Sequence, residues 1–597
     1  MGTFVTFPTD IEEVDVIIAG GGVTGCVVAS RLIEAEPSLS VLVIESGRDT
    51  YNEPSVIHPA LWRTNYTPDN LRVFFHEAIE EEQLANRKSI VQVGNTLGGG
   101  SSINLLMYMR PQRCDYDSWN TKTWTADGLL PYLKKFETYH GPGKAEHHGF
   151  NGPVHVSSGN FRSKEAEDSF LEAMNQVGIP EVEDLQDFDS IGVTRLLKYV
   201  SPEGKRQDIA HAYLHPKLQN VKYRGLRVLV ETEVVRVLFD DRRASGVEFR
   251  PNPTFQTNKD PKTTRTVKAK RLVVLSCGTL GTPPVLERSG VGDPTILERA
   301  GVPLVANVPG IGNHYQDHNV CIYTYKSSLP PESTFDGIHT GQVDIGSLLT
   351  NKDSILGWNG IDASSKIRPT ASEVDALGVD FKNAWDKDFK NQPSKPLVSM
   401  IFATGLLGNR TNVPPGQYFS LAVFTTYPYS RGHMHITGPN IDDRPEFKTG
   451  YLSDQHDIDL KTQLWAYKKQ REVVQRMSIH RGEISHRHPS FDADSAASYA
   501  VTDPKDVTYS AKDDAAIETW IRQNLTTCWH GLGTCKMAPL EDMGVVDESL
   551  GVYGVHGLKI ADLSVIPQNV CSNTMNTALL VGEKAADIFA RDLSLVQ

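Results

Sequence analysis

Three glycines with the spacing G-x-G-x-x-G, at Gly20, Gly22 and Gly25, are followed 20 residues later by the acid Glu45. In such a pattern the first glycine permits a tight turn, the second lets the backbone approach a pyrophosphate, and the third lets a helix pack closely on a strand. The start of that helix offers free N–H groups and a partial positive charge to the phosphates. The acid is placed to hydrogen-bond a ribose hydroxyl. These residues predict a site for a dinucleotide, FAD or NAD.

Other residues that could do chemistry have a simpler interpretation. The histidines that come nearest to a metal cluster are His480, His486 and His488, but their spacing of i, i+6 and i+8 lacks matching carboxylate or cysteine partners. Cys528 and Cys535 are seven residues apart, which fits no zinc or redox motif. We therefore predict no metal site, and we expect these two cysteines to be packed thiols.

The glycine pattern lies between elements that would position it. Residues 14–19 form a short apolar strand, apolar residues then recur at helical spacing, and residues 41–44 form a second buried strand. This βαβ arrangement is half of a doubly wound sheet. Further strands are predicted at these ranges: 226–230, 234–239, 271–276 and 558–561.

The region from about 325 to 525 differs in character. It predicts strands at 418–427 and 433–437, and amphipathic helices at 462–477 and 513–523. The fold class is therefore α/β, with a Rossmann-like nucleotide-binding domain that is discontinuous in sequence and an α+β substrate domain of a sheet plus helices. We assign these ranges to the nucleotide-binding domain: 1–160, 206–320 and 526–597. We assign these to the substrate domain: 161–205 and 321–525.

Length and composition limit the choice of function. A chain of 597 residues is too long for one ordinary core, so two closely packed domains are expected. The net charge of −13 argues against nucleic-acid and anionic-membrane partners, and no apolar run approaches the roughly 20 residues of a membrane span. The acidic N-terminus and seven scattered cysteines predict an intracellular, cytoplasmic protein. The last three residues are not an SKL-type signal, although a peroxisomal location stays open.

Two long segments carry a family resemblance. Residues 94–104 read GNTLGGGSSIN and continue to Tyr108, Pro111 and Asp117, and residues 278–283 read GTLGTP and continue to SGVG at 289–292. Both segments, in this order, resemble the two signatures of the glucose–methanol–choline (GMC) oxidoreductases. The resemblance extends from about residue 14 to 590, and within the family it is strongest to the fungal alcohol (methanol) oxidases.

The resemblance implies FAD as the cofactor. Val234 should meet the adenine through its backbone, and Asp562 should lie near the pyrophosphate or the ribityl chain. Some relatives have a histidine at the position of Ile103 that bonds covalently to the flavin, so isoleucine predicts non-covalent FAD. The residues expected to contact FAD are Gly20, Gly22, Val23, Thr24, Gly25, Glu45, Thr96, Gly99, Gly100, Ser101, Asn104, Leu105, Met107, Val234, Trp529, Asp562, Leu563, Asn573 and Thr574.

The resemblance also implies the catalytic residues. His530 matches the family histidine that faces the flavin, and Asn573 matches the second catalytic position, which is His in some relatives and Asn in others. We expect His530 to take the hydroxyl proton of an alcohol and Asn573 to hold the alcohol oxygen, while flavin N5 accepts hydride. Leu105, Trp529, His530 and Asn573 should line the substrate pocket. Methanol-oxidising relatives have Phe where this chain has Leu105, so we expect a larger primary alcohol.

Three functions remain in competition at this point. An oxidase would pass the electrons to O2 and make H2O2, and this is our prediction. A dehydrogenase would use a quinone or another acceptor, while a non-redox relative such as a lyase or cyclase would keep FAD and use its base differently. Light-driven fatty-acid decarboxylation is less well supported, because the resemblance is to alcohol oxidases. The oligomeric state stays open.

Overall fold

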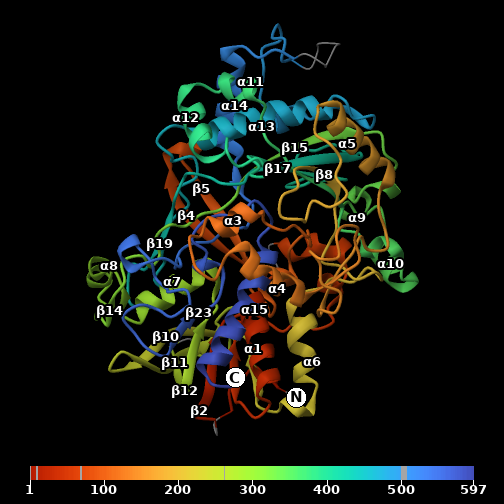
Figure 1. Cartoon of the computed structure of the whole chain (residues 1–597). Coiled ribbons are helices and arrows are strands. Elements are labelled where there is room, and N and C mark those ends of the chain that lie inside the picture. The colour runs from red at the N-terminus through yellow and green to blue at the C-terminus, as the bar shows by residue number, and fades with distance from the viewer. Residues whose placement is uncertain (1, 9–10, 68–69, 261, 499–506, 597) are drawn as a thin grey trace.

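A computed structural model of the chain describes residues 2–8, 11–67, 70–260, 262–498 and 507–596. Figure 1 shows two sheets at opposite ends of an elongated molecule, with the nucleotide-binding pattern in the lower one. Helices α13 (Ile458–Val474) and α14 (Ala511–Asn524) lie at the upper end. Among the described helices, none combines the length and apolar character that a membrane span requires.

The lower sheet has eight strands, and its centre is parallel. The order is β1-β9-β3-β2-β12-β11-β10, and β23 pairs with β12. The bounds are β1 Thr3–Phe4, β2 Glu13–Ala19, β3 Val41–Ile44, β9 Leu226–Leu229, β10 Thr232–Asp240, β11 Arg243–Pro251, β12 Arg265–Leu275 and β23 Leu558–Ile560. All four residues of β3 are buried, as expected for a strand covered on both faces. The predicted strands are thus confirmed to within a few residues, apart from the start of β12.

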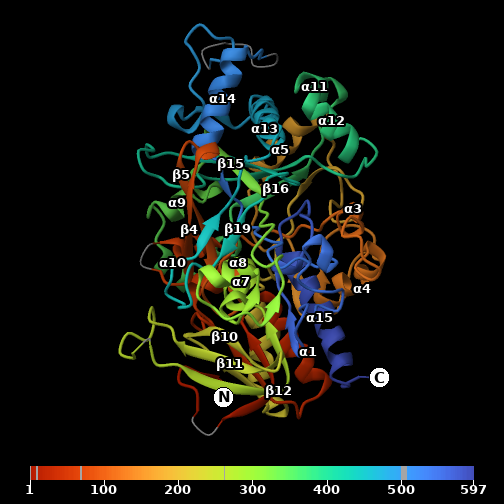
Figure 2. The ribbon, with the colours of Figure 1, turned by 90° about the vertical axis from the view of Figure 1, so that its left-hand side faces the viewer.

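The parallel centre joins distant parts of the chain. Leu272 to Leu275 of β12 pair with Val16 to Ala19 of β2 on one side, while β23 pairs with the same end of β12. Helix α1 (Val23–Ala35) follows β2 and packs against α15 (Met575–Asp592), and the two helices lie side by side in both views (Figures 1 and 2). This topology confirms a nucleotide-binding domain that is discontinuous in sequence.

The upper sheet has seven antiparallel strands. The order is β21-β15-β18-β17-β16-β8, with β22 also paired to β15. The bounds are β8 Gly192–Arg195, β15 Asn319–Ser327, β16 Ile361–Lys366, β17 Val398–Ala403, β18 Tyr418–Thr425, β21 His480–Glu483 and β22 Thr526–Thr527. The predicted strand at 418–427 and both predicted helices are confirmed, as α13 and α14.

The two faces of the upper sheet bury different clusters. In β15, Cys321, Tyr323 and Tyr325 belong to the cluster that includes α13 and α5 (Lys164–Gln176). Val320 and Ile322 point the other way, into a second apolar cluster. This alternation follows from the two-residue period of a strand. One face therefore carries helices, and the other is available for a site between the two sheets.

Candidate active site

The glycine turn and the first signature loop are in contact. The N–H of Gly98 donates to the carbonyl oxygen of Gly21 at 2.7 Å, and a Cβ added at Gly99 would lie 2.9 Å from the Cα of Gly22. A Cβ added at Gly22 or Gly100, in contrast, would meet nothing within 4 Å. Open space thus lies beside the N-terminus of α1, where backbone N–H groups attract phosphate. This cradle fits the pyrophosphate of a dinucleotide.

Two carboxylates lie along this cradle. Glu45 accepts backbone hydrogen bonds from Gly21 at 2.7 Å and Gly47 at 2.8 Å. Burial raises the pKa of Glu45, and these bonds oppose the shift. Oε1 also accepts from the Ser46 hydroxyl at 3.3 Å, so Oε2 is the oxygen that has a further lone pair for a ribose hydroxyl. Asp562 accepts from Gly278 N at 2.9 Å and Thr282 Oγ1 at 2.6 Å, so it holds the start of helix α7 (Gly278–Arg288) beside the cradle.

Polar side chains of the signature loop also hold the loop itself. The Ser101 hydroxyl donates to the carbonyl of Gly98 at 2.6 Å, and Asn104 Oδ1 accepts from Arg206 Nη1 at 2.9 Å. Arg206 is buried, and the same nitrogen also donates to the carbonyl of Ser101 at 3.0 Å. Sequence reasoning did not find Arg206, because it lies outside every motif. These bonds fix the path of a loop whose glycines face the cradle.

His530 and Asn573 come together although 43 residues separate them. Asn573 Nδ2 lies 3.1 Å from His530 Nε2. On the other side of the imidazole, His530 Nδ1 lies 2.8 Å from Nδ1 of His318. Burial lowers the pKa of His530 well below its ordinary value, and the neighbouring His318 adds to this. His530 is therefore a neutral imidazole at pH 7, in the state that accepts a proton.

Strand pairing and a strained turn place His530. Strand β22 pairs with β15 so that Thr527 lies opposite Asn319, which brings the residues after β22 beside His318. Trp529 then turns the chain with φ of 60°, a conformation that costs a residue other than glycine about 1 kcal/mol or more. The backbone N–H of His530 donates to Asp317 Oδ1 at 2.9 Å, which holds the turn in place.

The wall beside His530 is apolar. The Phe424 ring lies 5.9 Å from the His530 ring, centroid to centroid. Leu105 packs on the cluster that includes Phe424 and Cys528, and Trp529, which is 40% exposed, lies 6.2 Å from the ring of Tyr66. Phe424 thus joins His530 to the apolar cluster on which Leu105 packs, and the prediction that all four residues line one substrate pocket stays a prediction. An apolar wall with one base and one amide suits an organic substrate with a single reacting hydroxyl.

The other residues predicted to contact FAD lie on several different elements. Val234 lies in β10 at the nucleotide-binding end, and Thr96 belongs to the signature loop, where its hydroxyl donates to a backbone carbonyl. Leu563 directly follows Asp562, and Thr574 is the residue before α15. Met107 is buried in the apolar cluster beside the substrate wall. Their contacts with FAD stay predictions.

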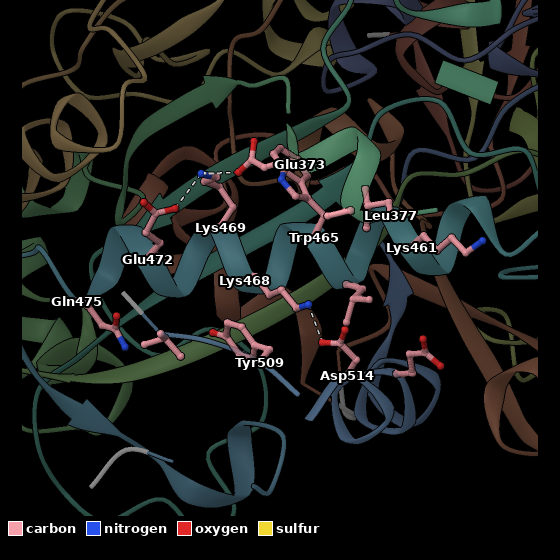
Figure 3. Close-up of a pocket in the computed structure, with 14 residues that line it drawn as sticks. Glu373, Leu377, Lys461, Trp465, Lys468, Lys469, Glu472, Gln475, Tyr509 and Asp514 are labelled. Carbon is pink, nitrogen blue, oxygen red and sulfur yellow. Dashed lines mark hydrogen bonds and ion pairs between the residues drawn. The ribbon is translucent and has the colours of Figure 1, made fainter. Parts of the chain in front are cut away.

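A separate cavity of about 500 Å³ lies among α11 (Ala371–Ala376), α13 and α14 (Figure 3). Five of its charged side chains pair with each other: Lys469 lies 2.8 Å from both Glu373 and Glu472, and Lys468 lies 2.6 Å from Asp514. It opens on the helix-covered face of the upper sheet, whereas His530 lies by the other face. This cavity is therefore not part of the candidate active site.

Metal ligation has no support in the described part of the chain, where no group of three or more His, Cys, Asp or Glu side chains is arranged to hold an ion. His488 is buried, and its Nε2 lies 2.9 Å from the carbonyl oxygen of Thr324. Cys528 and Cys535 are buried free thiols, as predicted.

Comparisons with known proteins identify the family of the chain. The family model described as GMC oxidoreductase matches in two parts, at residues 14–320 and 428–582. The chain is 38% identical to an alcohol oxidase of Pichia angusta over 641 residues, covering 98% of this chain and 95% of that protein. An alcohol oxidase of Candida boidinii is likewise 38% identical, with the same coverage. The solved structure of an FAD-dependent oxidoreductase from Chaetomium thermophilum superposes with a TM-score of 0.82 at 24% identity, over 98% of this chain and all of that one, which supports the fold.

Proposed function

The chain belongs to the GMC oxidoreductase family, and on that basis we propose that it oxidises a primary alcohol to the aldehyde with FAD and reduces O2 to H2O2. Similarity to alcohol oxidases at 36–38% identity over 98% of the chain supports this reaction. The observation that carries the proposal is the His530–Asn573 pair, 3.1 Å apart, beside an apolar wall.

The glycine cradle, with Glu45 and Asp562 along it, would hold FAD. When bound, FAD supplies the acceptor for the hydride that leaves the alcohol carbon. The backbone N–H groups of the α1 N-terminus would bind the pyrophosphate, and Glu45 would accept from the ribose. The buried Ile103 has no nucleophilic atom, so we propose that FAD is held without a covalent bond.

His530 would serve as the general base. Its neutral imidazole would take the hydroxyl proton of the alcohol. The C–H bond of the carbon that bears the hydroxyl would break, and its electron pair would leave with the hydrogen as hydride. The bound alcohol would take the place of the direct Asn573–His530 contact, with Asn573 Nδ2 donating to the alcohol oxygen and the hydroxyl donating to Nε2 of His530. Burial excludes water from this pair, which strengthens both interactions.

The substrate would be larger than methanol. Leu105, Phe424 and Tyr66 present an apolar surface beside His530, and leucine occupies less space than phenylalanine at position 105. Burial of apolar substrate atoms against this wall would add binding energy in proportion to the area removed from water. We therefore propose benzylic or longer-chain primary alcohols as the substrate class.

We also propose an intracellular, cytoplasmic location. All seven cysteines are free in the structure, which is typical of proteins in a reducing compartment.

The test is anaerobic reduction of the purified yellow holoenzyme by a panel of alcohols, from methanol to benzylic and long-chain substrates. We expect one class to bleach the flavin absorbance, and air to restore it with formation of H2O2. Bleaching that air cannot reverse would instead identify a dehydrogenase. Flavin that no alcohol reduces would contradict the proposal and favour a non-redox reaction.

A further inference from the structure

His318 lies directly behind His530, on the side away from Asn573. It is fully buried, and Phe424 stacks on its ring with centroids 4.8 Å apart. Its Nε2 lies 2.7 Å from the carbonyl oxygen of Val570 and 3.1 Å from that of Thr426. Its Nδ1 lies 2.8 Å from Nδ1 of His530. Every ring nitrogen of His318 is therefore in hydrogen-bonding contact.

The two carbonyls decide where the proton of His318 lies. A carbonyl oxygen can only accept, so Nε2 of His318 must carry the hydrogen. Burial lowers the pKa of His318 to about 4, so the ring is neutral at pH 7 and its Nδ1 has a lone pair. A contact of 2.8 Å between two nitrogens requires one hydrogen between them. Nδ1 of His530 must supply it.

The proton of His530 is thereby placed on Nδ1, and its Nε2 is left with a lone pair. That lone pair faces the amide of Asn573, which donates to it through Nδ2. Asn573 alone does not determine which ring nitrogen of His530 carries the proton, because its other amide atom, Oδ1, is buried and has no hydrogen-bond partner in the described part of the chain that would fix the orientation of the amide. A flipped amide would accept from a protonated Nε2 equally well. The selection between the two tautomers comes from His318.

We propose that His318 is a positioning residue that fixes the tautomer of His530 with the Nε2 lone pair on the side of Asn573, where the alcohol would bind. The inference rests on the proposed function, in which His530 takes the alcohol proton. It adds that the backbone carbonyls of Thr426 and Val570, through His318, determine which nitrogen of His530 is the base.

The other ionisable groups packed against this pair do not compete for the role. Asp317 accepts hydrogen bonds from Thr527, Tyr451, Tyr315 and the backbone of His530, at 2.5, 2.6, 3.0 and 2.9 Å. It contacts His530 through the backbone rather than the ring. Burial raises the pKa of both tyrosines, so they stay protonated at neutral pH. Burial likewise raises the pKa of the neighbouring Cys528 thiol.

The first test compares three variants as FAD-loaded enzymes, with the rate of flavin reduction measured at saturating alcohol under anaerobic conditions. His318→Phe keeps the ring volume and removes the acceptor, so we expect about a 100-fold lower rate, within the range that general-base catalysis contributes. The alcohol Kd should change less than about 3-fold, because the contacts to substrate remain. His318→Asn places an amide oxygen near the position that Nδ1 of His318 occupies in the wild type. Its rate of flavin reduction should therefore be at least about 10-fold higher than that of His318→Phe.

His488→Phe is the matched control. His488 is also buried and also bonded to a backbone carbonyl of the upper sheet, at Thr324, but it does not contact His530. We expect its reduction rate to stay within about 3-fold of the wild type. A His318→Phe enzyme that reduces FAD at that same rate would overturn the proposal. So would a His318→Asn enzyme as slow as His318→Phe, since the loss would then reflect packing alone.

The second test needs no turnover. In wild-type holoenzyme with ¹⁵N-labelled histidine, the nitrogen chemical shifts of His530 should show a protonated Nδ1 and an unprotonated Nε2 at pH 7, with the reverse for His318. A protonated Nε2 on His530 would overturn the proposal even if every variant failed to fold. If no alcohol reduces the flavin, the proposed function fails, but these shifts still decide the tautomer.

Discussion

His530 owes its position to the backbone conformation of its neighbour and to a buried carboxylate. Trp529 turns the chain in the left-handed region, and Asp317 binds the next backbone N–H. The left-handed conformation of Trp529 costs free energy. The hydrogen bonds that Asp317 accepts offset this cost, because they are buried and each is stronger than in water. A base held in this way needs little reorganisation when the alcohol arrives.

Replacing the base should separate catalysis from cofactor binding. We expect His530→Gln to lower the rate of flavin reduction by about 1,000-fold, because the amide cannot take the proton, with little loss of bound FAD. Stopped-flow absorbance measures the first quantity and the flavin-to-protein ratio the second. His486→Gln, at an exposed histidine, is the control. A His530→Gln enzyme that loses its FAD would show that the histidine is mainly structural.

The side chain at position 105 should set the size of the substrate. Leu105→Phe fills space beside the apolar wall, so we expect kcat/KM for benzyl alcohol to fall at least about 10-fold relative to that for ethanol. Leu304→Phe, at a side chain that is 53% exposed, should leave this ratio unchanged. Steady-state H2O2 formation with both alcohols measures the ratio. An unchanged ratio in Leu105→Phe would place the substrate elsewhere.

The start of α1 combines two glycines with different tasks. A Cβ at Gly25 would lie 2.1 Å from the carbonyl oxygen of Gly20, whereas one at Gly22 would enter open space. We expect Gly25→Ala to destabilise the FAD-free protein by about 1–3 kcal/mol through overpacking. Gly22→Ala should leave that stability unchanged and weaken FAD binding at least about 10-fold, since its methyl group would enter the pyrophosphate space.

Each glycine variant serves as the control for the other. Thermal unfolding of the FAD-free proteins measures stability, and flavin titration measures affinity. If Gly22→Ala binds FAD as tightly as the wild type, the pyrophosphate does not lie over α1 in the way proposed.

The sequence was informative about elements that have local patterns. The strands at 41–44 and 226–229, the helix at 458–474 and the glycine turn follow from periodicity and spacing, because their burial is set by neighbours a few residues away. The catalytic pair, in contrast, was predicted from the family resemblance and not from spacing. His318 was missed altogether: it meets His530 only because β15 pairs with β22 across about 200 residues, and no local signal specifies that pairing.

At the scale of the whole molecule, buried neutral histidines make stability depend on pH. The pKa of His318 is lowered to about 4, and burial also lowers that of His76 to about 4. Because the pKa of these histidines is lower in the folded state, the unfolded chain binds more protons than the folded chain once the pH falls below about 6.5. Stability is therefore lost between about pH 6.5 and 4. For the fully buried His318, the free energy of unfolding at pH 5 is lower than at neutral pH by about 2 kcal/mol.

We expect the apparent Tm of the wild type to fall from pH 7 to pH 5, and that of His318→Phe to fall less. The other titrating groups are common to both proteins, and among them His530 contacts His318, so the difference between the two proteins reports this buried histidine pair. Differential scanning calorimetry at one fixed scan rate measures it. A Tm difference that is the same at both pH values would contradict the assignment of a neutral His318.

The pairing of β12 with both β2 and β23 has a consequence for biosynthesis. The nucleotide-binding sheet begins at residue 3 and is not complete until residue 560 has been made. At a translation rate of roughly 5–20 residues per second, this interval lasts roughly half a minute to two minutes. From the synthesis of β12 until that of β23, the edge of β12 at Val273 to Leu275 lacks its partner strand, and α1 lacks α15. The nascent chain is therefore a natural client for chaperones, and FAD loading belongs to the end of synthesis rather than its beginning.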